Sequence, residues 1–193
     1  MKRYILFSNP TKDVMPTIIP LLFPKELENK VLAYMPCEGW SDRDQEQEYT
    51  NFWIDLARKN NTTLLGIDNA KPKATNEIEK LKKANILLIT GGNTYTLLRN
   101  IRNNHIYEAM KDFTKKDNFV MAGWSAGALI LTPSIALSRD ANMFGIVDLT
   151  ALNLVPFEVL PHYQDSEKEK IDEYKAKTKK DVRTIKEDEY III

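Results

Sequence analysis

The segment Gly123-Trp124-Ser125-Ala126-Gly127 has the form G-x-S-x-G, in which a serine can act as a nucleophile. Apolar residues 119–122 precede it and residues 128–131 (ALIL) follow it, which predicts a tight turn between a strand and a helix. The flanking glycines let strand and helix approach closely, and the turn exposes the Ser125 hydroxyl. The N–H of Ala126 would then face an oxyanion on an attacked carbonyl. The alternative interpretation is a glycine-rich turn in which Ser125 only caps the helix.

A nucleophilic serine needs a base, and imidazole is the usual one. The chain has two histidines. His105 lies in a polar stretch between two predicted helices, which favours a surface position. His162 follows the apolar run 157–160 and Pro161, at the end of a predicted strand. Strand ends of a parallel sheet converge on one edge, so we predict His162 as the base, with a purely structural histidine as the alternative.

The acid that would orient the imidazole is harder to choose. Asp140 follows the predicted nucleophile in the segment LSRD, and Glu187 lies near the C-terminus in IKEDEY. Either carboxylate could hold the required tautomer of His162. The sequence leaves the choice between them open.

A second glycine turn, Gly91-Gly92-Asn93-Thr94, ends the apolar run 86–90 and begins a predicted helix. The Gly92 N–H is suited to complete an oxyanion hole, because no side chain blocks a substrate carbonyl there. Phosphate binding is the competing interpretation. It is disfavoured because neither a G-x-G-x-x-G spacing nor a Lys-Ser/Thr ending is present. A helix cap at Asn93 or Thr94 is compatible with either role.

Cys37 is the single cysteine, so an intramolecular disulfide is excluded and a reducing compartment is favoured. As an alternative nucleophile it lacks an elbow and a neighbouring histidine. The N-terminal apolar stretch is too short for a signal peptide, and no apolar run approaches the roughly 20 residues that span a bilayer. We therefore predict a cytoplasmic protein.

The elements that must position these residues alternate between short apolar runs and longer amphipathic ones. This alternation predicts a mostly parallel sheet with helices on both sides, in one domain over residues 1–193. Ligands bind such sheets at the carboxyl ends of the strands, where both glycine turns lie. The predicted strands are residues 4–7, 31–35, 63–67, 86–90 and 119–122, and the predicted helices are residues 44–59, 76–83, 94–102, 106–113 and 165–180.

The formal net charge is zero, with 27 basic and 27 acidic residues. The field of the whole protein would therefore attract neither nucleic acid nor an anionic membrane, and we predict neither as a partner. A zero net charge neither promotes nor excludes self-association, so a homodimer is compatible with the sequence.

Three motifs in this order resemble the peptidase E (aspartyl dipeptidase) family, which includes the cyanophycinases: GGNT at 91–94, GWSAGA at 123–128 and LPHY at 160–163. The resemblance implies a three-layer α/β/α sandwich of the flavodoxin-like kind, related to class I glutamine amidotransferases. It also implies a serine peptidase without a metal or organic cofactor. Ser125 matches the nucleophile, His162 the base and Gly92 the oxyanion glycine, while Asp140 and Glu187 each match a position proposed for the third member. We expect substrate contacts from the motif residues Asn93, Trp124 and Tyr163.

One departure concerns specificity. Aspartyl dipeptidases carry an arginine after the histidine, thought to pair with the substrate aspartate, whereas residues 163–170 (YQDSEKEK) contain none. A lysine offers a point charge instead of a bidentate fork, which puts a preference for an N-terminal aspartate in doubt. We predict a peptidase that hydrolyses short peptides through an acyl-enzyme. The alternatives are a small-molecule esterase and a catalytically silent binding module of the same fold.

Overall fold

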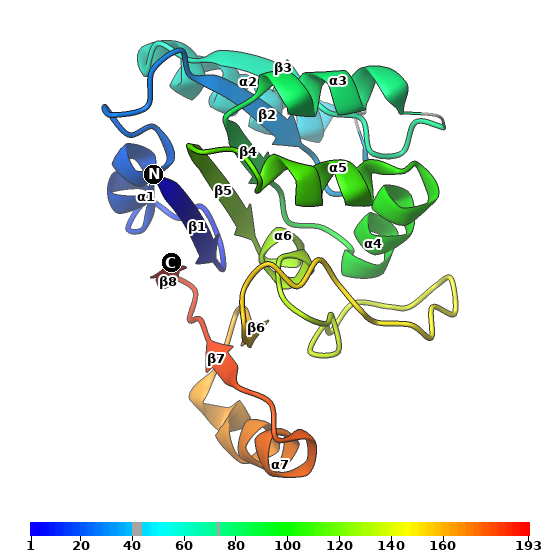
Figure 1. Cartoon of the computed structure of the whole chain (residues 1–193). Helices are drawn as coiled ribbons and strands as arrows, with labels where there is room; N and C mark the ends of the chain where they lie inside the picture. Colours follow the sequence, from blue (N-terminus) through cyan, green and yellow to red (C-terminus); the bar gives the residue numbers. More distant parts are fainter. Residues whose placement is uncertain (40–43, 73) are drawn as a thin grey trace.

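The computed structural model describes residues 1–39, 44–72 and 74–193. Its main sheet has six strands in the order β3-β2-β4-β5-β1-β8 (Figure 1). All neighbouring strands are parallel except the edge strand β8, which runs antiparallel to β1. The strands are β1 Lys2–Phe7, β2 Val31–Met35, β3 Thr63–Gly66, β4 Ile86–Ile89, β5 Phe119–Trp124 and β8 Tyr190–Ile192.

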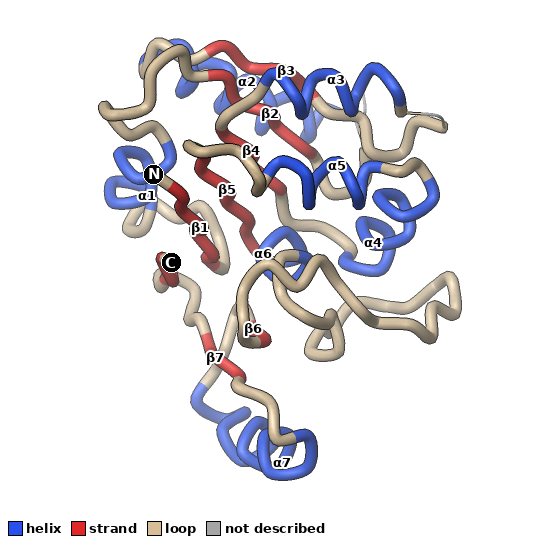
Figure 2. Tube along the Cα trace, in the orientation of Figure 1, coloured by secondary structure: helices blue, strands red, loops and turns tan. Residues whose placement is uncertain are grey.

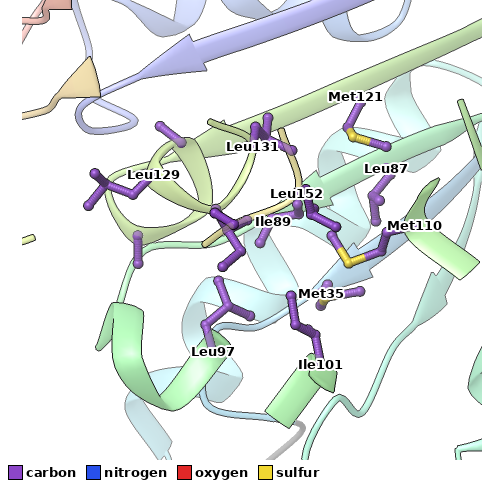
Figure 3. Packing of buried hydrophobic residues seen from close by; sticks show 14 of the residues in the cluster. Met35, Leu87, Ile89, Leu97, Ile101, Met110, Met121, Leu129, Leu131 and Leu152 are labelled. Atoms are coloured by element: carbon purple, nitrogen blue, oxygen red, sulfur yellow. The ribbon is translucent and has the colours of Figure 1, made fainter. Parts of the chain in front are cut away.

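Helices cover both faces of this sheet, because its central strands are apolar on both faces. In β4, Leu87 and Ile89 pack into one buried cluster, and Ile86 and Leu88 pack into another on the opposite face. The first cluster, part of which is shown in Figure 3, receives α3 Thr75–Lys83, α4 Thr94–Asn103, α5 Ile106–Phe113 and α6 Ala126–Ile130. The second receives α1 Met15–Leu22 and α2 Asp44–Lys59. The predicted α/β/α sandwich with a mostly parallel sheet is confirmed.

A small separate module carries the segment that follows Pro156. Strands β6 Glu158–Leu160 and β7 Val182–Thr184 form a two-stranded parallel sheet, joined by the short helix η1 Asp165–Glu167 and by α7 Lys168–Thr178. Figure 2 shows this module projecting from the main sheet. The expectation that the strand before His162 ends at the edge of the main sheet is therefore wrong. The strand has three residues, and its ladder pairs it with β7 instead.

The module has its own interior. Leu160, Ile171 and Val182 form a small apolar cluster. Beside it, the buried Glu158 carboxylate accepts hydrogen bonds from the Tyr174 hydroxyl (2.8 Å) and from Lys180 Nζ (2.6 Å), so its charge is compensated. Among the described residues, no helix has the length and apolar character needed to cross a bilayer.

Candidate active site

Ser125 occupies a strained turn between β5 and α6. Its backbone has φ 51° and ψ −115°, a conformation that residues with a side chain rarely adopt. Both flanking glycines are required. A Cβ on Gly123 would lie 2.2 Å from the Gly127 carbonyl oxygen, and one on Gly127 would lie 2.3 Å from the Ile89 carbonyl oxygen. The predicted elbow is therefore present, with strand and helix in backbone contact.

His162 lies between Ser125 and Glu187. Its Nε2 is 2.9 Å from Ser125 Oγ, and its Nδ1 is 2.6 Å from Glu187 Oε2. The three side chains come from the β5–α6 turn, from the segment after β6 and from the segment after β7. With the proton on Nδ1, the imidazole donates to the carboxylate and can accept from the serine hydroxyl. The hydrogen bond from His162, assisted by one from Asn9, holds the pKa of the Glu187 carboxyl below its usual value.

The Asp140 carboxylate lies apart from His162, against the N-terminus of α4. Its Oδ2 accepts from Thr94 N at 2.8 Å, from Thr94 Oγ1 at 2.5 Å and from Ser138 Oγ at 3.0 Å. A carboxylate there complements the positive end of the helix. Of the two acids that the sequence left open, the structure brings Glu187 to His162 and uses Asp140 to cap a helix.

The glycine turn 91–94 packs against the elbow. A Cβ on Gly91 would lie 3.2 Å from Ser125 Cβ, and one on Gly92 would lie 2.8 Å from Cys37 Cβ. Gly92 also has φ +145°, so glycine is needed there for both reasons. Asn93 caps α4 with its side chain: Oδ1 accepts from Thr96 N and Nδ2 donates to the Ala141 carbonyl.

A cavity of about 450 Å³ opens beside Ser125 and His162. Trp124 lines it as expected, whereas Asn93 and Tyr163 do not, and Tyr163 packs on the apolar cluster of the small module. Among the described residues that line the cavity, Glu38 is the one carboxylate. The lining residues are Ser8, Asn9, Tyr34, Pro36, Cys37, Glu38, Gly39, Tyr49, Thr50, Thr90, Gly91, Gly92, Trp124, Ser125 and His162.

Comparison with known proteins identifies the family. The model described as peptidase family S51 matches residues 6–193. The chain belongs to peptidase family S51. Peptidase E of Shigella flexneri serotype 5b (strain 8401) and Peptidase E of Escherichia coli (strain K12 / DH10B) are each 26% identical to it over 168 residues, which cover 84% of this chain and 69% of each relative. This S51 member is thus a serine-type peptidase.

Solved structures show the same architecture. A proposed peptidase E from Listeria monocytogenes EGD-e superimposes with a TM-score of 0.74 at 26% identity, covering 100% of this chain and 94% of that one. A peptidase from an acI-B1 actinobacterium has a TM-score of 0.71 at 13% identity, covering 100% and 83%, and supports the fold alone. The resemblance drawn from three short motifs is confirmed.

Several site contacts of this S51 peptidase were not predicted from the sequence. Ser8 and Asn9 line the cavity, and Arg139 places Nη1 and Nη2 3.4 and 3.5 Å from the His162 carbonyl oxygen while pairing with Glu167 at 2.7 Å. A signal existed for the first two, because Ser8 and Asn9 directly follow β1 at the carboxyl edge of the sheet. The Arg139 contact joins residues 23 apart in the chain and has no local signature.

Two further reactive side chains, Cys37 and His105, make no hydrogen bond to Ser125 or His162 among the described contacts, although Cys37 lines the cavity. Cys37 is 2% exposed, its thiol donates to the Asn93 carbonyl, and burial raises its pKa well above the usual value. A thiol held protonated is a poor nucleophile. His105 is an exposed residue before α5. Within the described residues, no cluster of three or more His, Cys, Asp or Glu side chains could hold a metal ion.

Proposed function

We propose that this peptidase hydrolyses short peptides with Ser125 as nucleophile, His162 as general base and Glu187 as the orienting acid. His162 Nε2 takes the hydroxyl proton as Ser125 Oγ attacks the scissile carbonyl. His162 then gives that proton to the leaving amine as the C–N bond breaks. Water, deprotonated in turn by His162, attacks the resulting ester and releases the amino-terminal product. The observation that carries this proposal is the pair of hydrogen bonds on His162, 2.9 Å to Ser125 and 2.6 Å to Glu187.

The oxyanion of the tetrahedral intermediate would lie between the N–H groups of Gly92 and Ala126. Ala126 is the first residue of α6, where backbone N–H groups have no partner within the helix. The turn that contains Gly92 packs against Ser125, and Gly92 has no side chain to obstruct a carbonyl. Each such donor is typically worth about 3 kcal/mol in the transition state.

Labelling by a fluorophosphonate probe tests the proposed roles of Ser125 and His162. We expect labelling of the wild type, none of Ser125→Ala, and at least about 1,000-fold slower labelling of His162→Ala. Ser134→Ala is the matched control, because Ser134 is a buried serine outside the cavity lining. A folded wild type that resists the probe while hydrolysing peptides would rule out the acyl-enzyme. Hydrolysis of p-nitrophenyl esters without hydrolysis of peptides would favour the esterase alternative.

The charge of the cavity supports a substrate with a cationic amino end. The Glu38 carboxylate lies beside the Gly92 turn, with Oε1 3.4 Å from Asn93 N, close to where a substrate carbonyl would sit. It would attract a free α-ammonium group or a basic first residue and repel an acidic one. Because Glu38 is exposed, we expect only about a two- to fivefold preference in kcat/KM for Lys-Leu over Asp-Leu, lost in Glu38→Gln. Faster hydrolysis of Asp-Leu by the wild type would refute this selectivity.

A further inference from the structure

We propose that Phe7, Ser8 and Asn9, at the carboxyl end of β1, hold the groups of the active site in their relative positions, and that Ser8 and Asn9 are positioning residues for the reaction. We call these three residues the β1 template. The proposal rests on the proposed roles of Ser125, His162 and Glu187. Three consecutive residues, Phe7, Ser8 and Asn9, each hold one of those three groups through a separate hydrogen bond.

The first two bonds fix the nucleophile and the base through their backbones. The Phe7 carbonyl accepts from Ser125 N at 3.0 Å, which ties the strained elbow to the neighbouring strand. Ser8 Oγ accepts from His162 N at 2.9 Å and donates to the Ile185 carbonyl at 2.8 Å. One hydroxyl therefore joins the segment that bears the base to the segment that leads to the acid.

Ser8 is suited to this role because it is fully buried, with a relative exposure of 0%. A hydroxyl supplies a donor and an acceptor together, and both are used here. An alanine would leave the His162 N–H without this partner, whereas the Ile185 carbonyl would keep the bond that it accepts from Tyr163 N at 3.0 Å. A threonine retains the hydroxyl and can restore both bonds.

Asn9 acts on the acid side chain. Its Nδ2 donates to Glu187 Oε1 at 2.8 Å, which leaves Oε2 facing His162 Nδ1. The Glu187 side chain is 53% exposed, so packing alone does not fix the plane of its carboxylate. The hydrogen bonds from Asn9 to Oε1 and from His162 to Oε2 together fix the plane of this carboxylate. The Asn9 bond also contributes to the lowered pKa of Glu187, which keeps the acid ionised.

The topology explains why such a template is needed. Ser125 belongs to the main sheet, whereas His162 and Glu187 follow β6 and β7 of the small module, whose ladder pairs those two strands with each other. The parallel β6–β7 ladder, which ends with Leu160 opposite Thr184, brings the segments that bear His162 and Glu187 side by side, but it includes no strand of the main sheet and so does not place either residue against Ser125. The end of β1 lies beside the elbow of β5 on one side, and on the other side Phe7 is paired with Tyr190 of β8, three residues after Glu187.

Four variants and two controls test the proposal. Ser8→Ala, Ser8→Thr, Asn9→Leu and the double variant Ser8→Ala/Asn9→Leu are compared with Ser134→Ala and Asn60→Leu. Asn60 is a half-buried asparagine whose Nδ2 donates a single 2.8 Å bond to the Leu56 carbonyl, outside the cavity lining. Each protein is assayed for Tm, for kcat and KM on Ala-Leu, and for the rate of fluorophosphonate labelling.

A misplacement of about 1 Å can cost about 100-fold in rate, so we expect kcat and the labelling rate to fall about 10- to 100-fold in Ser8→Ala and Asn9→Leu. KM should stay within about twofold, and Ser8→Thr should recover most of kcat. The two controls should lose stability without losing kcat. If Ser8→Ala and Asn9→Leu keep the wild-type kcat while their Tm falls as in the controls, the segment is only structural and the proposal is overturned.

Crystal structures of the same variants test the positioning role of the β1 template independently of the proposed function. A Ser125–His162 or His162–Glu187 separation beyond 3.5 Å in Ser8→Ala or Asn9→Leu supports the template even if the wild type fails to react with the probe. Unchanged separations in both variants would overturn the template even if the wild type is an active serine peptidase.

Discussion

Glu187→Gln and Asp140→Asn are matched exchanges that separate the two acids by their effects. The amide of Glu187→Gln would favour the wrong tautomer of His162, an exchange that costs about 10,000-fold in kcat where the acid is buried. Here the Glu187 side chain is 53% exposed, so water can take over part of its role. We therefore expect kcat to fall about 100- to 10,000-fold. KM should change little, because Glu187 does not line the cavity.

Asp140→Asn should show the opposite pattern. The carboxylate caps α4 through Thr94 N and Thr94 Oγ1, and the amide retains an acceptor oxygen but loses the charge. Loss of such a charged cap costs about 1 kcal/mol, which in a chain of this size lowers Tm by about 2–4 °C. We expect kcat to stay within about twofold of the wild type.

The assay is steady-state hydrolysis of Ala-Leu at pH 7.5 together with thermal unfolding of the same preparations. Glu187→Asp serves as the control for geometry, since it keeps the charge but shortens the reach to His162. The reasoning fails if Asp140→Asn abolishes turnover at unchanged Tm, or if Glu187→Gln retains more than about a tenth of the wild-type kcat.

Three further predictions follow from single contacts. Gly92→Ala should lower kcat about 100-fold, because its Cβ would lie 2.8 Å from Cys37 Cβ at φ +145° and displace an oxyanion donor; wild-type kcat would exclude that role. Cys37 should resist iodoacetamide at pH 8 until the protein is unfolded, since burial raises its thiol pKa; rapid alkylation of the native protein would contradict this. The lowered pKa of Glu187 predicts that the wild type exceeds Glu187→Gln in unfolding free energy above about pH 4.5, with the difference shrinking as pH falls through the folded-state pKa; a difference that grows on acidification would show the opposite sign.

The sequence predicted best those parts of the site whose proposed chemistry depends on the geometry of one short backbone segment. The elbow at Ser125 was recognisable because its two glycines are demanded by backbone contacts between strand and helix. The central strands were recognisable because burial on both faces produces continuous apolar runs, as in β4 and β5. Their predicted bounds differ from the observed ones by two residues or fewer.

Other features depend on contacts between distant segments. Glu187 reaches His162 because β6 pairs with β7 and brings the segments after them together, and a pair of three-residue strands leaves little trace in sequence. Helix α1 was not predicted, and its sequence argues against a helix at one position: Pro20 lies inside it, whereas Pro16 lies in the first turn, where proline is tolerated. It forms nonetheless because Met15, Ile18 and Leu22 are buried against the sheet, so tertiary packing outweighs propensity.

The candidate site is divided between two sheets, and Ser125 requires a different setting from His162 and Glu187. The proposed nucleophile Ser125 has a strained backbone, which only rigid surroundings maintain, and the six-stranded sheet supplies them. The proposed base His162 lines the cavity, and both it and the proposed acid Glu187 come from segments that follow strands of the small module. At the end of β1, the Phe7 carbonyl accepts from Ser125 N within the main sheet, whereas Ser8 accepts from His162 N and Asn9 donates to Glu187, and these last two bonds join the two parts. Each bond holds a different group, so the loss of one bond should misplace one group and leave the other two in position. We therefore expect kcat to fall in steps, with the double variant Ser8→Ala/Asn9→Leu slower than either single variant.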